Sequence, residues 1–389
     1  MKDRAWILLA VRQALSLERF GRLSPESVGT RATSKPVIEP AECSDMLGQI
    51  RRHRLIGLLA RHATALELPA ELASSLHRAH QHEVGRGLAA VAATRRTSRA
   101  LHDADIPHLV VKGVALAAVV TGDPTARGGG DIDIWVPAGS LPTVRSVLTS
   151  LGFHVRPSSG RPAPTERSRA WRPYLFAVHE QAWDRVGDTA FMSETVDAHW
   201  RLAHRQSVVG YEFPEALARS IAVPVVGSTV RTLCPSDALT HVVEHGRKEA
   251  FPTLRSLVDI VRLVDACGVE TVRTLAVGRS ERARNLRLGL AVAATIAPDL
   301  AEIVPLTRTR RRLANLALEG SLSLQLGGGV RRHLDLRQRL AIASRQHGWA
   351  VLSSPGPISA LTYVLQTTIG IVGFGLTSFM ATTKVGPQE

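Results

Sequence analysis

Two carboxylates set two residues apart carry the clearest chemical signal in this chain. Asp131 and Asp133 belong to an otherwise apolar segment, residues 131–136, whose pattern predicts a β-strand. Because the side chains of a strand alternate between its faces, both carboxylates should project from the same face. Two neighbouring carboxylates repel each other and are costly to desolvate. Mg²⁺ would offset that cost, since it takes hard oxygen ligands and shares them with substrate phosphates, so the pair predicts a metal-and-phosphate site.

Lys112-Gly113 is a candidate anion site, because it follows a predicted strand, residues 106–111, and precedes a predicted helix. The free N–H groups and the positive dipole end of a helix start attract anions, and glycine lets phosphate approach the backbone closely. Lysine is also rare in this chain, with only five among the 48 Lys and Arg residues. An ordinary turn glycine beside a solvated lysine is the alternative. Arg127, which three glycines follow, is a further phosphate-binding candidate just ahead of the carboxylates.

A third carboxylate lies in another predicted strand, residues 195–200, where Asp197 and His199 share one face. Asp197 could ligate a metal ion or accept a proton from an attacking hydroxyl. His199 could orient that aspartate or contact phosphate, and a buried structural histidine is the alternative. If the two strands are neighbours, their three aspartates provide the carboxylates that two-metal nucleotidyl transfer needs.

These candidates lie in the middle of a largely helical chain. Helical spacing of apolar residues dominates the first hundred residues, and it returns after Pro214. Between these parts the pattern predicts a helix over 141–151, a loop over 157–172, and strands over 106–111, 132–136, 153–155, 174–178 and 195–200. We therefore divide the chain into a helical region (1–105), which includes a long helix over 69–102, a core (106–205), an arginine-rich helical domain (206–350) and an uncharged apolar tail (351–389).

Composition and charge indicate which partners and which cellular compartment to expect. The formal net charge of +14 comes almost wholly from arginine, a skew typical of a GC-rich coding bias. Aromatic residues make up only 4% and are not interleaved with the arginines, so nucleic acid is not an expected partner. Three scattered cysteines form no CxxC motif, which favours a reducing cytoplasm. His241 and His245 have metal-ligand spacing on a helix, but packing or lining of a cleft is favoured over a zinc site.

The last part of the chain carries no charge between residues 348 and 383. Residues 360–380 are long enough to span a bilayer, yet this stretch contains Gln366, glycines, serines and threonines that lower its hydropathy. A tail that packs on the core or docks a partner is therefore expected ahead of membrane contact.

With these residues in hand, the chain resembles the uncharacterised nucleotidyltransferase-like family of bacteria, a branch of the polymerase-β nucleotidyltransferase superfamily. The resemblance covers roughly residues 40–265 and rests on segments 106–116, 127–136 and 196–200. It implies an α+β fold in which a small mixed sheet with flanking helices lies between N-terminal and C-terminal helical regions. It also implies an NTP such as ATP as substrate, and two Mg²⁺ ions held by Asp131, Asp133 and Asp197.

The chain departs from active nucleotidyltransferases at one position. They usually carry a Gly-Ser pair at the helix start to hold the β,γ-phosphates, whereas this chain has Lys112-Gly113. Lysine could act there as a point charge on phosphate. We therefore expect an Mg²⁺-dependent nucleotidyltransferase that moves NMP to a hydroxyl or phosphate on a small molecule, peptide or protein. The alternatives are a catalytically degenerate module that binds a nucleotide or a partner in a biosynthetic pathway, and a modifier of a partner polypeptide.

Overall fold

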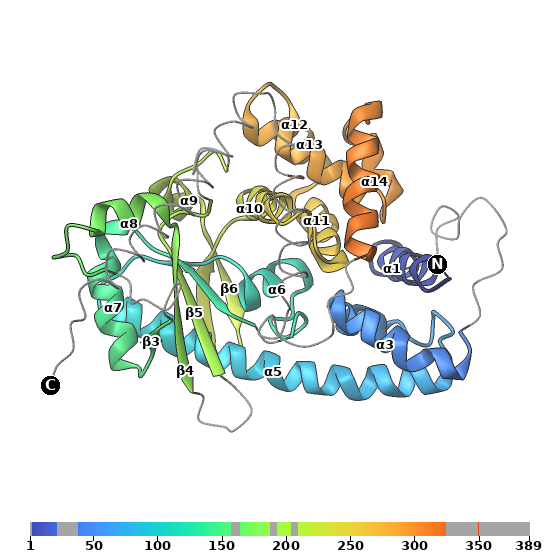
Figure 1. The fold of residues 1–389 in the computed structure, drawn as a ribbon, viewed down its shortest axis with the longest axis horizontal. Helices are drawn as coiled ribbons and strands as arrows, with labels where there is room; N and C mark the ends of the chain where they lie inside the picture. Colours follow the sequence, from blue (N-terminus) through green and yellow to red (C-terminus); the bar gives the residue numbers. More distant parts are fainter. Residues whose placement is uncertain are drawn as a thin grey trace, which may run out of the picture.

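A five-stranded mixed sheet lies beside a larger helical assembly in this structure, a computed structural model (Figure 1). The structure describes residues 2–21, 38–128, 130–156, 164–186, 193–203, 209–323 and 349. The strands are β1 (Leu109–Val110), β2 (Ile132–Trp135), β3 (His154–Val155), β4 (Glu180–Val186), β5 (Ser193–His199), β6 (Ile221–Val225) and β7 (Ser228–Thr232). The helices are α1 (Lys2–Phe20), α3 (Cys43–Arg52), α4 (Ile56–Arg61), α5 (Ala70–Asp103), α6 (Gly113–Thr121), α7 (Leu141–Ser150), α8 (Trp171–Ala177), α9 (Phe213–Arg219), α10 (Pro235–Lys248), α11 (Leu254–Cys267), α12 (Val269–Ala276), α13 (Glu281–Ala293) and α14 (Arg308–Ser323).

The sheet has the strand order β1-β2-β5-β4-β3. Its central pair, β2 and β5, is parallel, and the other neighbours are antiparallel. A parallel pair needs a long crossover, and the chain between β2 and β5 provides one that contains α7, α8, β3 and β4. The sheet is therefore small and mixed, as the resemblance implies.

One face of the sheet is apolar and packs on helices. Ile132, Ile134, Val196 and Ala198 alternate with polar residues along β2 and β5 and are all buried. They share a hydrophobic cluster with residues of α5 and α7, which cover this face. The polar residues between them must therefore leave the sheet on its opposite face.

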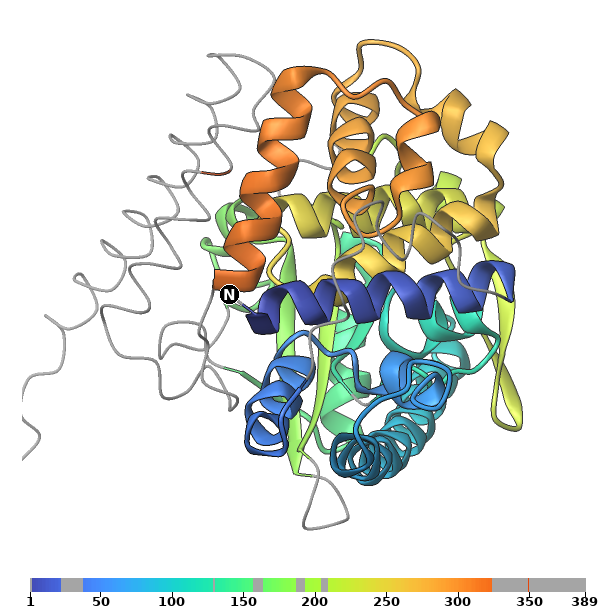
Figure 2. The same ribbon diagram turned by 90° about the vertical axis from the view of Figure 1, so that its right-hand side faces the viewer.

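The N-terminal helix belongs to the same hydrophobic core as the C-terminal helices. Arg12 donates to the carbonyl oxygen of Thr295 at 2.8 Å, and Arg19 pairs with Asp265 at 2.9 Å. Figure 2 shows α1 lying between the helices α3 to α5 and the later helices α11 to α14. The two ends of the helical part thus pack on each other around one core.

Several predicted elements are confirmed, including the long helix (α5), the helix over 141–151 (α7) and the strand–helix turn at Lys112-Gly113. The strand predicted over 174–178 is wrong, because these residues continue α8 and its end. The indole of Trp200 and the guanidinium of Arg201 donate to the carbonyl oxygen of Leu175, and Arg201 also reaches Phe176 and Val178. These donors satisfy the last carbonyls of a helix, which overrides the β-propensity of its aromatic residues.

Strands β4, β6 and β7 were not predicted, and β6 and β7 form a hairpin inside the region expected to be helical. The hairpin packs its valines against α6, so it supports the helix start at Gly113. The predicted tail, 351–389, and part of the predicted loop, 157–163, lie outside the described residues. No helix in the part of the chain that the structure describes is long and apolar enough to cross a membrane.

Packing of α5 on the sheet gives the first prediction. Leu101 is fully buried in the cluster beneath the sheet, whereas Leu88 in the same helix is 49% exposed. We expect Leu101→Ala to lower the free energy of unfolding by about 2–5 kcal/mol, because it removes buried methylenes and leaves a cavity. Leu88→Ala makes the same substitution in the same helix and should change it by less than about 1 kcal/mol. Denaturant unfolding measures both, and equal losses would contradict this packing.

Candidate active site

The two predicted acidic strands are neighbours, and their aspartates face each other. In the parallel pairing of β2 with β5, Asp133 lies directly opposite Asp197, and Trp135 lies opposite His199. Asp133 and Asp197 therefore project together from the face of the sheet that α5 does not cover. Asp131 is exposed and precedes the first residue of β2, so it lies at the end of the strand rather than inside it.

Lys112 and Gly113 lie beside the carboxylates, as expected. Lys112 is the residue before α6, and its Nζ lies 3.3 Å from Oδ1 of Asp133. Gly113 has a positive φ of 56°, and a Cβ there would lie 3.3 Å from the carbonyl oxygen of Asp131. Glycine adopts this left-handed φ at no steric cost and has no Cβ to crowd that oxygen, which favours the close approach of the helix start to the acidic strand.

His199 connects two carboxylates that lie on different strands. Its Nε2 is 3.1 Å from Oδ1 of Asp133, and its Nδ1 is 3.1 Å from Oε2 of Glu180 in β4. His199 is only 3% exposed and the Asp133 side chain 13%, so their contact is shielded from solvent, whereas the side chain of Glu180 is 42% exposed. Glu180 was not among the predicted site residues. The sequence of β4, Glu-Gln-Ala-Trp-Asp-Arg-Val, does not alternate polar and apolar residues, so no periodic signal marks Glu180 as part of a strand.

The two facing aspartates have opposite electrostatic environments. Burial alone would raise the pKa of Asp133, but the Lys112 ammonium and the hydrogen bond from His199 together lower it below its usual range. Burial, followed by repulsion from Asp133 and Asp131, raises the pKa of Asp197 to about 7. Oδ1 of Asp197 is buried without a hydrogen-bond partner among the described residues. One carboxylate is thus held charged, and its neighbour lacks a compensating group.

Two histidines of α10 line the same side of the sheet. His241 is 1% exposed, and neither of its ring nitrogens has a hydrogen-bond partner within the described segments. Burial and then the charge of Lys112 depress the pKa of His241, while Lys112 is the largest cause of the lowered pKa of His245. Both imidazoles are therefore held neutral near the lysine–aspartate pair, and whether they line a cleft stays a prediction.

The guanidinium of Arg127 makes its contacts away from the carboxylate pair. Its Nη2 donates to Oδ2 of Asp259 in α11 at 2.5 Å, and burial lowers its pKa. Among the predicted site residues, the structure thus brings together Lys112, Gly113, Asp131, Asp133, Asp197 and His199, while the guanidinium of Arg127 faces α11. Its role toward phosphate stays a prediction.

The donor set at the sheet suits a hard divalent cation. No three His, Cys, Asp or Glu side chains of the described segments converge on a point that would hold a metal ion. Magnesium, however, is usually bound by one or two protein carboxylates, with water and substrate phosphates as its other ligands. Asp133 and Asp197 provide such a pair, and the unpartnered Oδ1 of Asp197 is a buried oxygen that a cation would satisfy.

Sequence comparison assigns the class of protein that this sheet and its aspartates suggest. A family model described as an uncharacterised nucleotidyltransferase matches residues 39–298. The chain belongs to this uncharacterised nucleotidyltransferase family. Among solved structures it is similar to an antigenic nucleotidyltransferase-like protein from Paracoccidioides brasiliensis, with 15% identity and a TM-score of 0.34, over 57% of this chain and 91% of that one. No curated protein matches the chain.

The raised pKa of Asp197 gives a prediction for stability in metal-free buffer. In the folded state Asp197 keeps its proton up to about pH 7, whereas in the unfolded chain an aspartate loses it near pH 4. The free energy of unfolding of the wild type should therefore fall as the pH rises from about 4 to about 7. Asp197→Asn cannot ionise, so its melting temperature relative to wild type should increase from pH 4 to pH 7 and then level off.

Asp133→Asn is the matched control for this titration. The pKa of Asp133 is lowered in the folded state, so its charge stabilises the fold at pH values above the unfolded pKa. Asp133→Asn should therefore melt below wild type across pH 5 to 8, opposite in sign to Asp197→Asn. Thermal unfolding in the presence of a chelator measures both. Parallel pH curves for wild type and Asp197→Asn would contradict the assignment.

Proposed function

We propose that this chain is an Mg²⁺-dependent nucleotidyltransferase, which moves NMP from an NTP to a hydroxyl or phosphate on a small molecule, peptide or protein. The observation that carries the proposal is the facing pair of Asp133 and Asp197 beside the start of α6. This arrangement combines carboxylates for a divalent cation with a helix N-terminus and a lysine for phosphate. Membership of the nucleotidyltransferase family supports the same reaction class.

Each residue of the site has a distinct part in the proposed reaction. The backbone N–H groups that begin α6 and the ammonium of Lys112 bind the phosphates of the NTP. Asp133 and Asp197, with Asp131 at the end of the strand, would hold Mg²⁺, which would neutralise phosphate charge. As the alternative to ligating the cation, Asp197 accepts the proton of an attacking hydroxyl, a part that its pKa of about 7 in the metal-free protein suits.

His199 is a positioning residue in this scheme. Its ring lies between Asp133 and Glu180, at 3.1 Å from each carboxylate. The hydrogen bond from Nε2 restricts the rotation of Asp133 and holds its Oδ1 at a defined place on the sheet. The histidine therefore acts through the aspartate rather than on the nucleotide itself.

One contact favours a second candidate function, a nucleotide-binding module without chemistry. The ammonium of Lys112 lies 3.3 Å from Oδ1 of Asp133, on the carboxylate that would hold a divalent cation. A permanent lysine–aspartate pair would satisfy the carboxylate without metal, and the nucleotide would then bind without transfer. The two functions differ in whether a cation displaces this ammonium.

Release of pyrophosphate tests the proposed transfer. With Mg²⁺, the purified protein should release pyrophosphate from at least one NTP, and Asp133→Asn should lower the rate by about 100-fold or more, because it removes a cation ligand from the transition state. Asp131→Asn should also reduce the rate strongly. Asp103→Asn changes an exposed aspartate at the end of α5 and should retain the wild-type rate. Full turnover in both site variants would exclude the metal assignment.

The same protein samples distinguish the two candidate functions. A binding module would be stabilised against thermal unfolding by an NTP, yet it would form no product and would retain this stabilisation in Asp197→Asn. A protein modifier would instead add the mass of one NMP to a polypeptide, which intact-mass measurement detects. Pyrophosphate release that depends on a small-molecule acceptor supports the transferase.

A further inference from the structure

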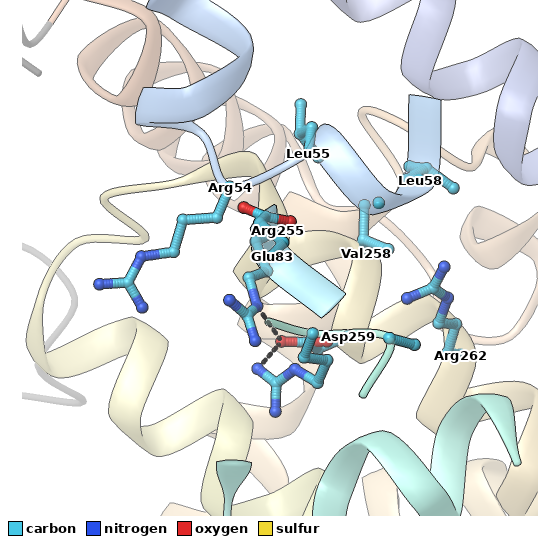
Figure 3. Close-up of a pocket in the computed structure, with 11 residues that line it drawn as sticks. Arg54, Leu55, Leu58, Glu83, Arg255, Val258, Asp259 and Arg262 are labelled. Carbon is cyan, nitrogen blue, oxygen red and sulfur yellow. Dashed lines mark hydrogen bonds and ion pairs between the residues drawn. The ribbon is translucent and has the colours of Figure 1, made fainter. Parts of the chain in front are cut away.

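A pocket lined by four arginines lies next to the loop that leads into the acidic strand. Figure 3 shows its walls, which come from the turn before α4, from α5, from the loop after α6 and from α11. Its charged lining residues are Arg54, Glu83, Arg127, Arg255, Asp259 and Arg262. This cluster, here called the arginine pocket, contains twice as many cations as anions.

The carboxylates at the arginine pocket do not satisfy all of its guanidinium groups. Asp259 accepts from Nη2 of Arg127 at 2.5 Å and lies 4.0 Å from Nε of Arg255, so one acid serves two arginines (Figure 3). Nε and Nη1 of Arg127 are buried and have no hydrogen-bond partner among the described residues. A buried donor of this kind is costly unless a ligand or water completes it.

The second acid of the pocket, Glu83, is largely removed from solvent. Burial raises the pKa of Glu83, although nearby arginines, Arg255 first among them, act in the opposite direction. Burial and then repulsion from Arg127 lower the pKa of Arg255 to about 9. Arg262 already pairs with Glu18, at 2.8 Å, outside the pocket lining. Positive charge therefore remains uncompensated around Arg127 and Arg255, which favours the entry of an anion.

The size of the pocket limits what can enter it. The enclosed space is about 20 Å³, enough for roughly one water-sized group. A nucleobase or a ribose does not fit, whereas one oxygen of a tetrahedral oxyanion does. The remaining oxygens would stay at the rim, where Arg54 is exposed. Guanidinium groups bind phosphate oxygens through paired N–H donors, which suits this arrangement.

The pocket is coupled to the acidic strand by close packing. Ala126 and Arg127 line the pocket and belong to the segment between α6 and Asp131. A Cβ at Gly57 of α4 would lie 3.0 Å from the carbonyl oxygen of Ala126, so α4 and this loop are in tight contact. An anion bound here would therefore lie against the loop that positions Asp131.

We propose that the arginine pocket binds a phosphoryl group of a substrate. Its ligand is a phosphate monoester or the end of a polyphosphate, carried either by the NTP or by the acceptor. The assignment to a substrate rests on the proposed function, whereas binding of phosphate itself does not. The pocket thus gives the site a second point of attachment, separate from the helix start at Gly113.

Calorimetric titration of the full chain with inorganic phosphate and with pyrophosphate, in metal-free buffer, tests the proposal. Arg54→Gln removes the rim cation. Arginine already adopts the left-handed φ of 56° at this position, and glutamine adopts it at a similar cost, so the substitution adds no backbone strain. It should weaken binding of the anion by roughly tenfold, as expected for the loss of a charge-assisted hydrogen bond. Arg51→Gln changes an exposed arginine of α3 that does not line the pocket, and it should bind within twofold of wild type.

The source of the phosphoryl group follows from competition with a non-hydrolysable NTP. If the NTP displaces pyrophosphate and Arg54→Gln weakens both alike, the pocket holds the triphosphate. If inorganic phosphate and the NTP bind together, the pocket serves the acceptor. No binding by wild type, or equal affinities of Arg54→Gln and Arg51→Gln, would overturn the proposal. Asp133→Asn should keep its phosphate affinity even where it loses transfer, so failure of the pocket and failure of the proposed function are distinguishable.

Discussion

The parallel pairing of β2 with β5 is the constraint on which the site depends, because it sets Asp133 directly opposite Asp197. Two carboxylates on one face of a buried strand pair cannot both be charged at low cost. The neighbouring groups stabilise the charge of only one of the two aspartates. Lys112 and His199 stabilise the charge of Asp133, while Asp197 is left with a raised pKa and an oxygen that has no partner in the described part of the chain.

The surrounding fold keeps this unfavourable pair in place. Alternating apolar residues of the two strands pack on α5 and α7, and a one-residue slip of either strand would move its aspartates into that apolar layer. The hairpin of β6 and β7 packs against α6 and so supports the helix start at Gly113. Apolar packing on one face of the sheet thus offsets the repulsion between the aspartates on the other face, an arrangement typical of functional sites.

The parts of the site that are local in the chain could be predicted from the sequence. The spacing of Asp131 and Asp133, the Lys112-Gly113 turn and the shared face of Asp197 and His199 follow from the periods of strands and helices. Contacts between segments that are far apart in the chain could not be predicted from these local patterns. Glu180 reaches His199 only through the pairing of β4 with β5, and Arg127 reaches Asp259 across 132 positions. The helical state of α8 likewise depends on donors from Trp200 and Arg201, which local propensity does not contain.

Lys112 connects the electrostatics of the sheet to the choice between transfer and simple binding. Its ammonium and a divalent cation would compete for the carboxylate of Asp133, since both are cations and Nζ already lies 3.3 Å from Oδ1. Released from the carboxylate, the lysine would remain at the start of α6, where the proposed function places the phosphates of the NTP. A cation that displaced the ammonium would thereby increase the positive charge available to the NTP. In an active enzyme, metal and nucleotide should therefore bind more tightly together than either does alone, because each removes an electrostatic cost of the other.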